Sequence, residues 1–462
     1  MLSTAANIAT MFFTMLYAFL ALGSCAVPLP TPVYAVQTEV PRDRQQEPRL
    51  TILSARGEES HSLLRAANLY MEENPGILIT VQTIGMEGDY NTALRARLLA
   101  EERVDLFHIF GHTDMAELAP HLEDLSDLYW ARQAVADTLA PVSTEEAFFG
   151  IPHSLDGLGL IANRKIFEAA GVSLAEIGSY DELEEAFRAL REVMTSGTMR
   201  TDFPNLETVT SLPGLDDDFL GRQLADIALG GEFESAAYTA QATSITYQNA
   251  EVMGLYVALL ARYATHGRGW STLVEIPASE QVENGLATER VAAIQQSVSV
   301  YPRLVALNPD LEGSLTLLPI FLPGGEQGHV YTHSPVYWAV NTAASEESKA
   351  LAKSFLTWLY RSEQGAAFLA EEMGLLSPYR DAAAPTSNPL HRQLLGQIDA
   401  GRSLPRQHRE FPAGWSGQFA DALRDYLTLI DLNWEEVAQR NRENWFDARS
   451  ASGGWEFAVG NW

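Results

Sequence analysis

Two stretches of this chain place residues of chemically useful types close together. Gly157, Gly159 and Ala162 match the G-x-G-x-x-A pattern of dinucleotide-binding loops, but such a loop must open a helix, and here the glycines run into the apolar segment LGLIANR. Asp216 to Asp218 lack the spaced ligands of a calcium loop, so we predict that they stabilise a helix N-terminus. The sequence contains no G-x-S-x-G, H-E-x-x-H or Walker pattern. It therefore predicts no catalytic residues, no metal and no cofactor.

The only cysteine, Cys25, has a chemistry that depends on its position. A single cysteine forms no internal disulfide and supplies no thiolate cluster for a metal. It ends the long uncharged apolar run 5–24, and the residues LGSC (22–25) resemble the bacterial lipobox, in which the cysteine is acylated. We therefore predict a lipoprotein signal peptide over 1–24, lipidation at Cys25 and a Pro-rich flexible tether over 25–49. The alternative is an uncleaved membrane anchor, because about 20 apolar residues span a bilayer and the first ten residues contain no Lys or Arg.

Length and charge exclude several classes of protein. The 462 residues are 46% hydrophobic, which is enough to bury a large core and excludes disorder or a disulfide-stapled miniprotein. The formal net charge of −29 would repel phosphate backbones and anionic lipid head groups, so we predict no nucleic-acid partner. The length suggests two or three domain-sized units.

From Leu50 onward, short apolar runs alternate with amphipathic ones, as expected of α/β units. The helices between them are long enough for crossover connections, so we predict mainly parallel sheets. The predicted strands are 50–55, 77–84, 104–110, 289–302, 315–321 and 336–341, with another entering a second unit within 148–172. The predicted helices are 62–74, 90–102, 181–195, 217–230, 248–265 and 348–373, with two more over 415–449 and a surface loop over 196–215.

Several of these segments, in this order, resemble the extracellular solute-binding proteins of bacterial ABC importers, in particular the carbohydrate-binding, maltose-binding-protein-like group (family 1). ENPGILITVQTI (73–84) and VDLFHIFGH (104–112) are similar to the second and third strands of that family. FFGIPHSLDGLGLIANRKIFEAAGV (148–172) is similar to its G-[IL]-P … N-[KR]-x-[LF]-F segment, and 337–381 to the late segment that recrosses to the first lobe. The resemblance covers residues 50 to 447 and is weakest over 196–240.

The resemblance implies a type II, two-lobed periplasmic-binding-protein-like α/β fold, each lobe a mainly parallel sheet flanked by helices, with hinge crossings between the lobes and closure over a solute. It also implies a division of the chain. Lobe 1 would comprise 50–155 and the return segment 330–376, and lobe 2 would comprise 156–329 and the C-terminal helices and tail, 377–462.

Solute contacts are expected where strands end at the crossings, because ligands of open α/β sheets bind at the carboxyl ends of strands. Sugars also stack on aromatic rings. Trp270 and Trp415 lie in polar, Gly-rich segments, where a large aromatic side chain is unexpected unless it has a binding or packing role. At Trp415 the resembling family often supplies a stacking ring. The predicted ligand-binding residues are Glu58, Phe110, His112, Asp156, Trp270, Ser297, His333, Tyr337 and Trp415.

The resulting hypothesis is a non-enzymatic, monomeric lipoprotein on the outer face of the cell membrane, which captures a carbohydrate, most simply an oligosaccharide, and delivers it to an ABC permease. Two alternatives stay open. A secreted carbohydrate-active enzyme would need two carboxylates at a defined separation, which a sequence does not measure. A solute-sensing receptor domain would signal through a membrane partner instead of feeding transport.

Overall fold

The computed structural model describes residues 34–35, 48–85, 87–265, 269–381, 386–429 and 432–451. The predicted signal peptide, Cys25 and the C-terminal residues from 452 lie outside the described residues, as does nearly all of the predicted tether. The two-residue strand β1 (Tyr34–Ala35) belongs to a separate N-terminal unit. All that follows concerns the unit that contains the residues from 48 onward.

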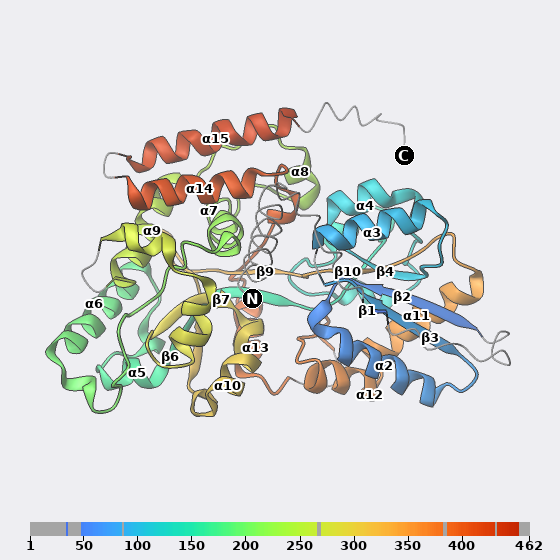
Figure 1. Cartoon of the computed structure of the whole chain (residues 1–462), viewed down its shortest axis with the longest axis horizontal. Coiled ribbons are helices and arrows are strands. Elements are labelled where there is room, and N and C mark those ends of the chain that lie inside the picture. The colour runs from blue at the N-terminus through green and yellow to red at the C-terminus, as the bar shows by residue number, and fades with distance from the viewer. Residues whose placement is uncertain are drawn as a thin grey trace, which may run out of the picture. The chain divides into compact units, whose positions relative to one another are not determined.

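The first sheet, at the right of Figure 1, is the core of the first lobe. Its strands in spatial order are β3 (Leu78–Thr83), β2 (Arg49–Ser54), β4 (Leu106–Ile109), β10 (Tyr337–Val340) and β5 (Ile151–Pro152). β2 runs parallel to β3 and β4, whereas β10 is antiparallel to both β4 and β5. The late strand β10 therefore completes a sheet that was started almost 300 residues earlier, as the resemblance implies.

Helices pack on both faces of this sheet. They are α2 (Ser60–Glu73), α3 (Glu87–Leu99), α4 (His112–Leu118), α11 (Glu346–Arg361) and α12 (Glu363–Ala367). α2 ends before Pro75-Gly76, where Gly76 has the positive φ of 91° that favours glycine. The single helix predicted over 348–373 is divided at Ser362, whose hydroxyl caps α12 by accepting the Gly365 N–H.

The second sheet has five strands and forms the core of the second lobe, at the left of Figure 1. Its strands are β11 (Ser403–Pro405), β9 (Val330–His333), β6 (Asp156–Asn163), β7 (Ala293–Ser297) and β8 (Leu315–Leu318). β7, β8 and β9 are each antiparallel to β6, and only β9 and β11 pair in parallel. The expectation of a mainly parallel sheet is wrong for this lobe. β7, β8 and β9 share one direction, but β6 enters from the first lobe and runs against all three.

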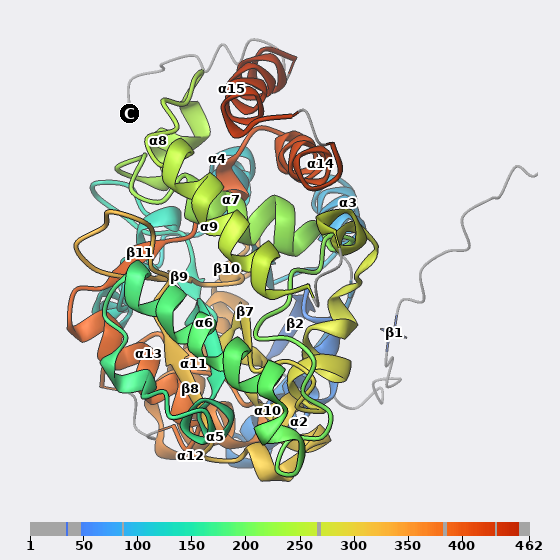
Figure 2. The ribbon, with the colours of Figure 1, turned by 90° about the vertical axis from the view of Figure 1, so that its left-hand side faces the viewer.

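Helices surround the second sheet on its outer face and on top, as Figure 2 shows. They are α5 (Arg164–Ala169), α6 (Tyr180–Ser196), α7 (Leu224–Ala228), α8 (Ala236–Gln241), α9 (Ala250–Tyr263), α10 (Tyr301–Leu307), α13 (Pro389–Asp399), α14 (Trp415–Thr428) and α15 (Trp434–Ala451). The two helices predicted for the tail are confirmed as α14 and α15, which pack side by side. Among the described residues, no helix is both long and apolar enough to cross a bilayer.

The chain passes between the two sheets at residues 153–155, 334–336 and again after Met373. The crossings are hydrogen bonded to one another. The His153 N–H donates to Val336 O over 3.0 Å, and the Leu155 N–H donates to Leu376 O over 2.8 Å. This bundle of crossings brings the ends of β4, β7 and β9 and the start of β6 to one place in the molecule.

Candidate functional site

The start of β6 carries Asp156, and the end of β7 carries Ser297 opposite it. The Ser297 hydroxyl lies 2.5 Å from Asp156 Oδ1 and 2.7 Å from Oδ2, and the Gly157 N–H donates to Oδ1 over 2.8 Å. Burial raises the pKa of Asp156, although the Ser297 hydrogen bond and the guanidinium groups of Arg406 and Arg56 act in the opposite direction. The two predicted residues therefore lie together at the crossing as a polar pair, and their contact with a solute stays a prediction.

Glu58 and its neighbours follow β2 on the first lobe. Glu58 is largely exposed and forms an ion pair with Arg56 NH2 at 2.8 Å. The next residue, Glu59, is buried and binds Arg56 Nε at 2.9 Å and His153 Nε2 at 2.7 Å. Burial opposes ionisation of Glu59, but His153 and Arg56 outweigh it and lower its pKa to about 2. A carboxylate of the first lobe is thus tied to the first crossing.

His333 ends β9 and faces the cationic part of the site. Its ring centroid lies 5.9 Å from that of His408. Burial lowers the pKa of His333 well below its usual range, and Arg406 and His408 act in the same direction. The buried Nδ1 atom of His333 has no hydrogen-bond partner among the described residues. A neutral imidazole has one nitrogen that donates and one that accepts a hydrogen bond, which matches the chemistry of a solute hydroxyl.

Arg406 and His408 are held by Asp226 of α7. The Asp226 carboxylate lies 2.7 Å from Arg406 Nε and 2.7 Å from His408 Nδ1, and it accepts the backbone N–H groups of Gln407 and His408 at 2.8 and 2.9 Å. Burial would raise the pKa of Asp226, but these neighbours lower it to about 2. Burial lowers the pKa of His408, although the Asp226 carboxylate acts in the opposite direction.

Phe110 and His112 lie at the end of β4 and the start of α4. The Phe110 ring meets Tyr90 edge-on at 5.9 Å, and the guanidinium of Arg409 from the second lobe lies 4.8 Å from its centroid. The backbone N–H of His112 donates to Glu410 Oε1 over 2.7 Å, and burial lowers the pKa of the imidazole. Both predicted residues thus lie where the two lobes meet.

The two predicted tryptophans do not reach this place. Trp415 is fully buried between Phe411, Phe419 and Trp445, and its Nε1–H donates to Asn441 O over 3.0 Å. The prediction that Trp415 stacks on a solute is wrong, because both of its faces are already packed.

Trp270 begins the 3₁₀ helix η9 (Trp270–Glu275). It packs 6.1 Å from Tyr426, near the C-terminal end of α14. The structure therefore does not bring it to the crossings.

Tyr337 lies beside the crossings at the start of β10, but its side chain is only 2% exposed. It belongs to the core of the first lobe, and burial raises its pKa.

The sequence analysis missed several residues that organise the crossings and the contact between the lobes. Arg56, His153, Asp226, Arg409 and Glu410 all contribute to this region, and none was predicted. One local signal was present: the segment PRQHRE (405–410) is dense in charge and stands between a strand and a buried helix.

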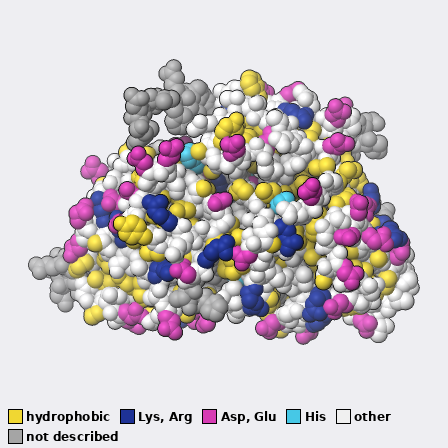
Figure 3. All heavy atoms as spheres, turned by 180° about the vertical axis from the view of Figure 1, so that it is seen from behind, with side chains coloured by type: hydrophobic (Ala, Val, Ile, Leu, Met, Phe, Trp, Pro, Cys, Tyr) yellow, Lys and Arg dark blue, Asp and Glu magenta, His cyan; other side chains and the backbone are white. Residues whose placement is uncertain are grey.

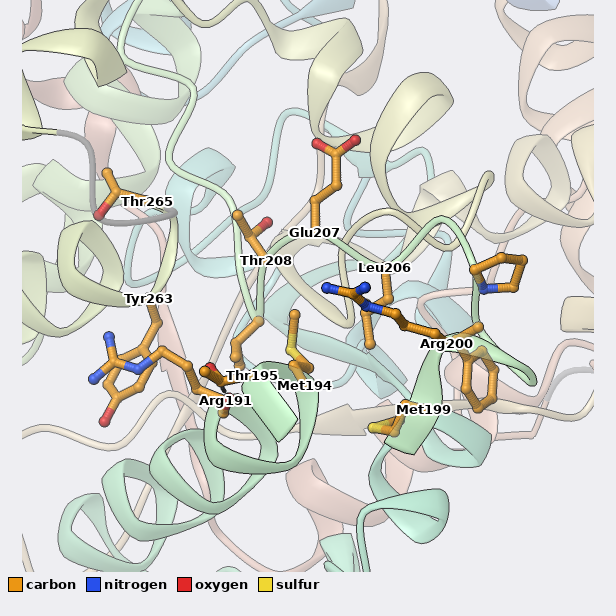
Figure 4. Close-up of a pocket in the computed structure, with 13 residues that line it drawn as sticks. Arg191, Met194, Thr195, Met199, Arg200, Leu206, Glu207, Thr208, Tyr263 and Thr265 are labelled. Carbon is orange, nitrogen blue, oxygen red and sulfur yellow. Dashed lines mark hydrogen bonds between the residues drawn. The ribbon is translucent and has the colours of Figure 1, made fainter. Parts of the chain in front are cut away.

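A surface pocket of about 720 Å³ opens elsewhere, on the second lobe. Figure 4 shows Arg191 and Met194 from α6 beside Tyr263 from α9, with the segment after α6 forming another wall. The Arg191 guanidinium lies 4.3 Å from the Tyr263 ring centroid. None of the predicted ligand-binding residues lines this pocket, so the crossing region remains the candidate site.

Comparisons with known proteins agree with the fold. A sequence model of the family described as bacterial extracellular solute-binding protein matches residues 55–366. A comparison with curated proteins finds no match.

Several solved structures are similar over most of the chain. The putative binding protein MsmE of Bacillus subtilis, in an open conformation, has a TM-score of 0.69 at 17% identity, covering 88% of this chain and 98% of that one. RafE of Streptococcus pneumoniae, in its apo form, has a TM-score of 0.69 at 14% identity, covering 87% of this chain and 98% of that one. A sugar transporter of Bacillus licheniformis in complex with stachyose has a TM-score of 0.62 at 17% identity, covering 87% of this chain and all (100%) of that one. At these identities the likeness shows a shared two-lobed α/β fold.

Proposed function

Because this chain belongs to the bacterial extracellular solute-binding proteins, we propose that it captures a carbohydrate, most simply an oligosaccharide, between its two lobes and delivers it to an ABC permease. The observation that carries the proposal is the cluster of polar side chains at the crossings. Asp156 and Ser297 from the second lobe lie within electrostatic reach of Arg56 from the first, and His333 lies beside them with a free acceptor or donor among the described residues.

The chemistry of this group suits a polyhydroxylated solute. A sugar hydroxyl both donates and accepts hydrogen bonds, so its partners must include carboxylates, hydroxyls and neutral imidazoles, and all three are present here. The stachyose complex of a similar fold supports the same class of solute. Hinge closure would place the groups of both lobes on the solute together, as a ligand that contacts both lobes favours the closed form.

A panel of oligosaccharides tests this proposal. We expect one or more of them to raise the unfolding temperature and to remain unchanged after prolonged incubation. Appearance of shorter products would favour the carbohydrate-active enzyme instead. No stabilisation by any sugar, together with stabilisation by a solute of another class, would contradict the carbohydrate proposal.

We further propose that the chain works outside the cytoplasm as a monomer that is attached to the membrane through acylated Cys25. We also propose that its lobes have the residue bounds predicted in the sequence analysis. Acylation on more than one position would supply stable anchoring, because one acyl chain binds membranes only marginally. Cys25→Ala should release the protein from membranes. A variant that stays bound after an alkaline wash would show that residues 5–24 form an uncleaved anchor.

A further inference from the structure

The first turn of α4 has no cap of its own. Its N-cap residue is Gly111, which has no side chain to accept the first backbone N–H groups. Those groups bind Glu410 instead. The His112 N–H donates to Glu410 Oε1 over 2.7 Å, the Thr113 N–H to Oε2 over 2.9 Å, and the Thr113 hydroxyl to Oε2 over 2.6 Å. The acceptor lies almost 300 residues further along the chain.

Glu410 belongs to the other lobe. It ends the short helix η15 (His408–Glu410), two residues after His408, which Asp226 holds, and directly before Phe411, which lies in the core of the second lobe. Its carbonyl oxygen accepts a hydrogen bond from Arg449 Nη2 of α15 over 3.1 Å. The carboxylate is therefore carried by the second lobe, whereas its donors are carried by the first.

The contact is close and shielded from water. Glu410 is only 3% exposed, and a Cβ built on Gly111 would overlap Glu410 Oε1. The other nearest atoms to that Cβ are Glu410 Cδ at 3.5 Å and Arg409 Cβ at 3.8 Å, which also belong to the second lobe. The backbone of Gly111 is extended, with φ 164°, so an alanine fits its own conformation, and its Cβ would displace the carboxylate end of the Glu410 side chain.

We propose that Glu410 is an interlobe latch, which holds the lobes together before any solute binds by capping α4 from the opposite lobe. Hydrogen bonds to a carboxylate are stronger than those between neutral groups, and these are formed only while the lobes touch. Opening returns both partners to water, so the latch shifts the equilibrium between open and closed forms without locking it. Solute entry then requires an opening that breaks this contact.

Distances between the lobes test the latch in the full chain without solute. Spin labels are placed at Ala96→Cys on α3 and Gln418→Cys on α14, two exposed positions on opposite lobes, with Cys25→Ser removing the native thiol. Double electron–electron resonance on this protein should show mainly the short distance. Glu410→Gln should add a longer distance and lower the closed-to-open ratio at least tenfold.

Glu232→Gln is the matched control. Glu232 accepts the backbone N–H groups of Thr246, Tyr247 and Gln248, so it performs the same capping chemistry entirely within the second lobe. This variant should lose stability and keep the short interlobe distance. If Glu232→Gln lengthens the distance as much as Glu410→Gln does, the effect belongs to general destabilisation and the proposal is overturned.

Gly111→Ala provides a second variant that keeps every charge and hydrogen-bonding group. The added Cβ should push the flexible end of the Glu410 side chain off the His112 N–H and so weaken the latch, while the extended backbone of residue 111 is kept. Gly417→Ala on α14, where an added Cβ meets nothing within 4 Å, is its control and should leave the distance unchanged. A wild-type protein that is already open, or a Gly111→Ala protein with the wild-type distance, would overturn the latch. Neither result depends on what the solute is.

Discussion

Residues 406–408 and residues 409–410 are consecutive parts of the second lobe, yet they contact different lobes. Arg406, Gln407 and His408 bind Asp226 in the second lobe, through hydrogen bonds of 2.7 to 2.9 Å. Arg409 and Glu410 face Phe110 and the first turn of α4 in the first lobe. This segment of the second lobe therefore has a boundary, between His408 and Arg409, where its contacts change from its own lobe to the opposite one.

The two halves of this segment are expected to have different energetic roles. Contacts within one lobe persist in open and closed forms, so they contribute to the free energy of unfolding. Contacts between lobes are lost on opening, so they contribute to the closed-to-open ratio instead. The same types of groups, carboxylates and guanidiniums, thus serve stability on one side of the boundary and conformational equilibrium on the other.

The largest expected effect is that of Trp415→Ala, at the end of the segment anchored in the second lobe. Because Trp415 is fully buried among aromatic side chains, we expect a loss of about 3–5 kcal/mol in the free energy of unfolding, with the interlobe distance unchanged. Chemical denaturation measures this loss. Trp270→Ala, whose ring is only partly buried, should cost less. A Trp415→Ala protein with wild-type stability and weakened sugar binding would return this ring to the site.

Asp226→Asn tests the anchor of residues 406–408. The pKa of Asp226 is lowered from 3.8 to about 2, so its ionised form contributes about 2 kcal/mol to stability. Because the folded pKa is the lower one, this contribution is complete above about pH 4 and is lost as the pH falls towards 2. The variant should therefore be less stable than the wild type at pH 7 and approach it in acid.

The exposed ion pair of Asp381 with Arg361 is the comparison for this variant. Asp381→Asn should change the free energy of unfolding by about 0–1 kcal/mol, because water and salt screen the pair. Denaturation series at several pH values measure both variants. An Asp226→Asn protein whose deficit stays constant down to pH 3 would show that lost packing, and not lost charge, explains it.

The sequence predicted the first sheet well because its strands are local apolar runs. Predicted strands 50–55, 77–84 and 104–110 correspond to β2, β3 and β4 with ends shifted by no more than two residues. The directions in the second sheet were wrong because β6 pairs with strands far along the chain, as in Leu158 with Ser297. Local periodicity contains no information on which way such a partner runs.

The site shows the same limit. The strand-end argument placed Asp156, Ser297 and His333 near the crossings, since each follows or begins an apolar run that is visible in the sequence, and their contact with a solute stays a prediction. It failed for Trp415, because the polar segment FPAGWSGQF does not reveal that Trp445 packs on its ring from 30 residues away. Glu410 could not be predicted either. Its carboxylate caps α4 only because the fold places it beside backbone N–H groups of the opposite lobe, and the local sequence does not show that contact.

Asp156→Asn tests the region between the two lobes, because burial raises the pKa of Asp156, and Arg406 of the second lobe and Arg56 of the first both act to lower it. We expect about tenfold weaker binding of the sugar identified in the panel, as a charged acceptor becomes neutral. The unfolding temperature of the free protein should hardly change, because burial of this carboxylate already opposes its charge. Calorimetric titration measures the affinity, with the exposed Asp399→Asn as the control. Unchanged affinity would remove Asp156 from the solute contacts.

Arg409→Ala has the smallest expected effect and decides whether Arg409, like Glu410, acts between the lobes. The guanidinium lies 4.8 Å from the Phe110 centroid, and a cation–π contact of this kind contributes about 0.5–1 kcal/mol at partly exposed sites. The closed-to-open ratio should therefore fall roughly two- to fivefold, as measured with the same spin labels, because 1.4 kcal/mol corresponds to tenfold. The free energy of unfolding should stay close to that of the wild type, since each lobe keeps its own core. Arg409→Lys, which retains the charge, should lie between the two. If Arg409→Ala instead lowers the free energy of unfolding and leaves the interlobe distance unchanged, Arg409 serves the second lobe alone, and Glu410 is the only residue of this segment that acts between lobes.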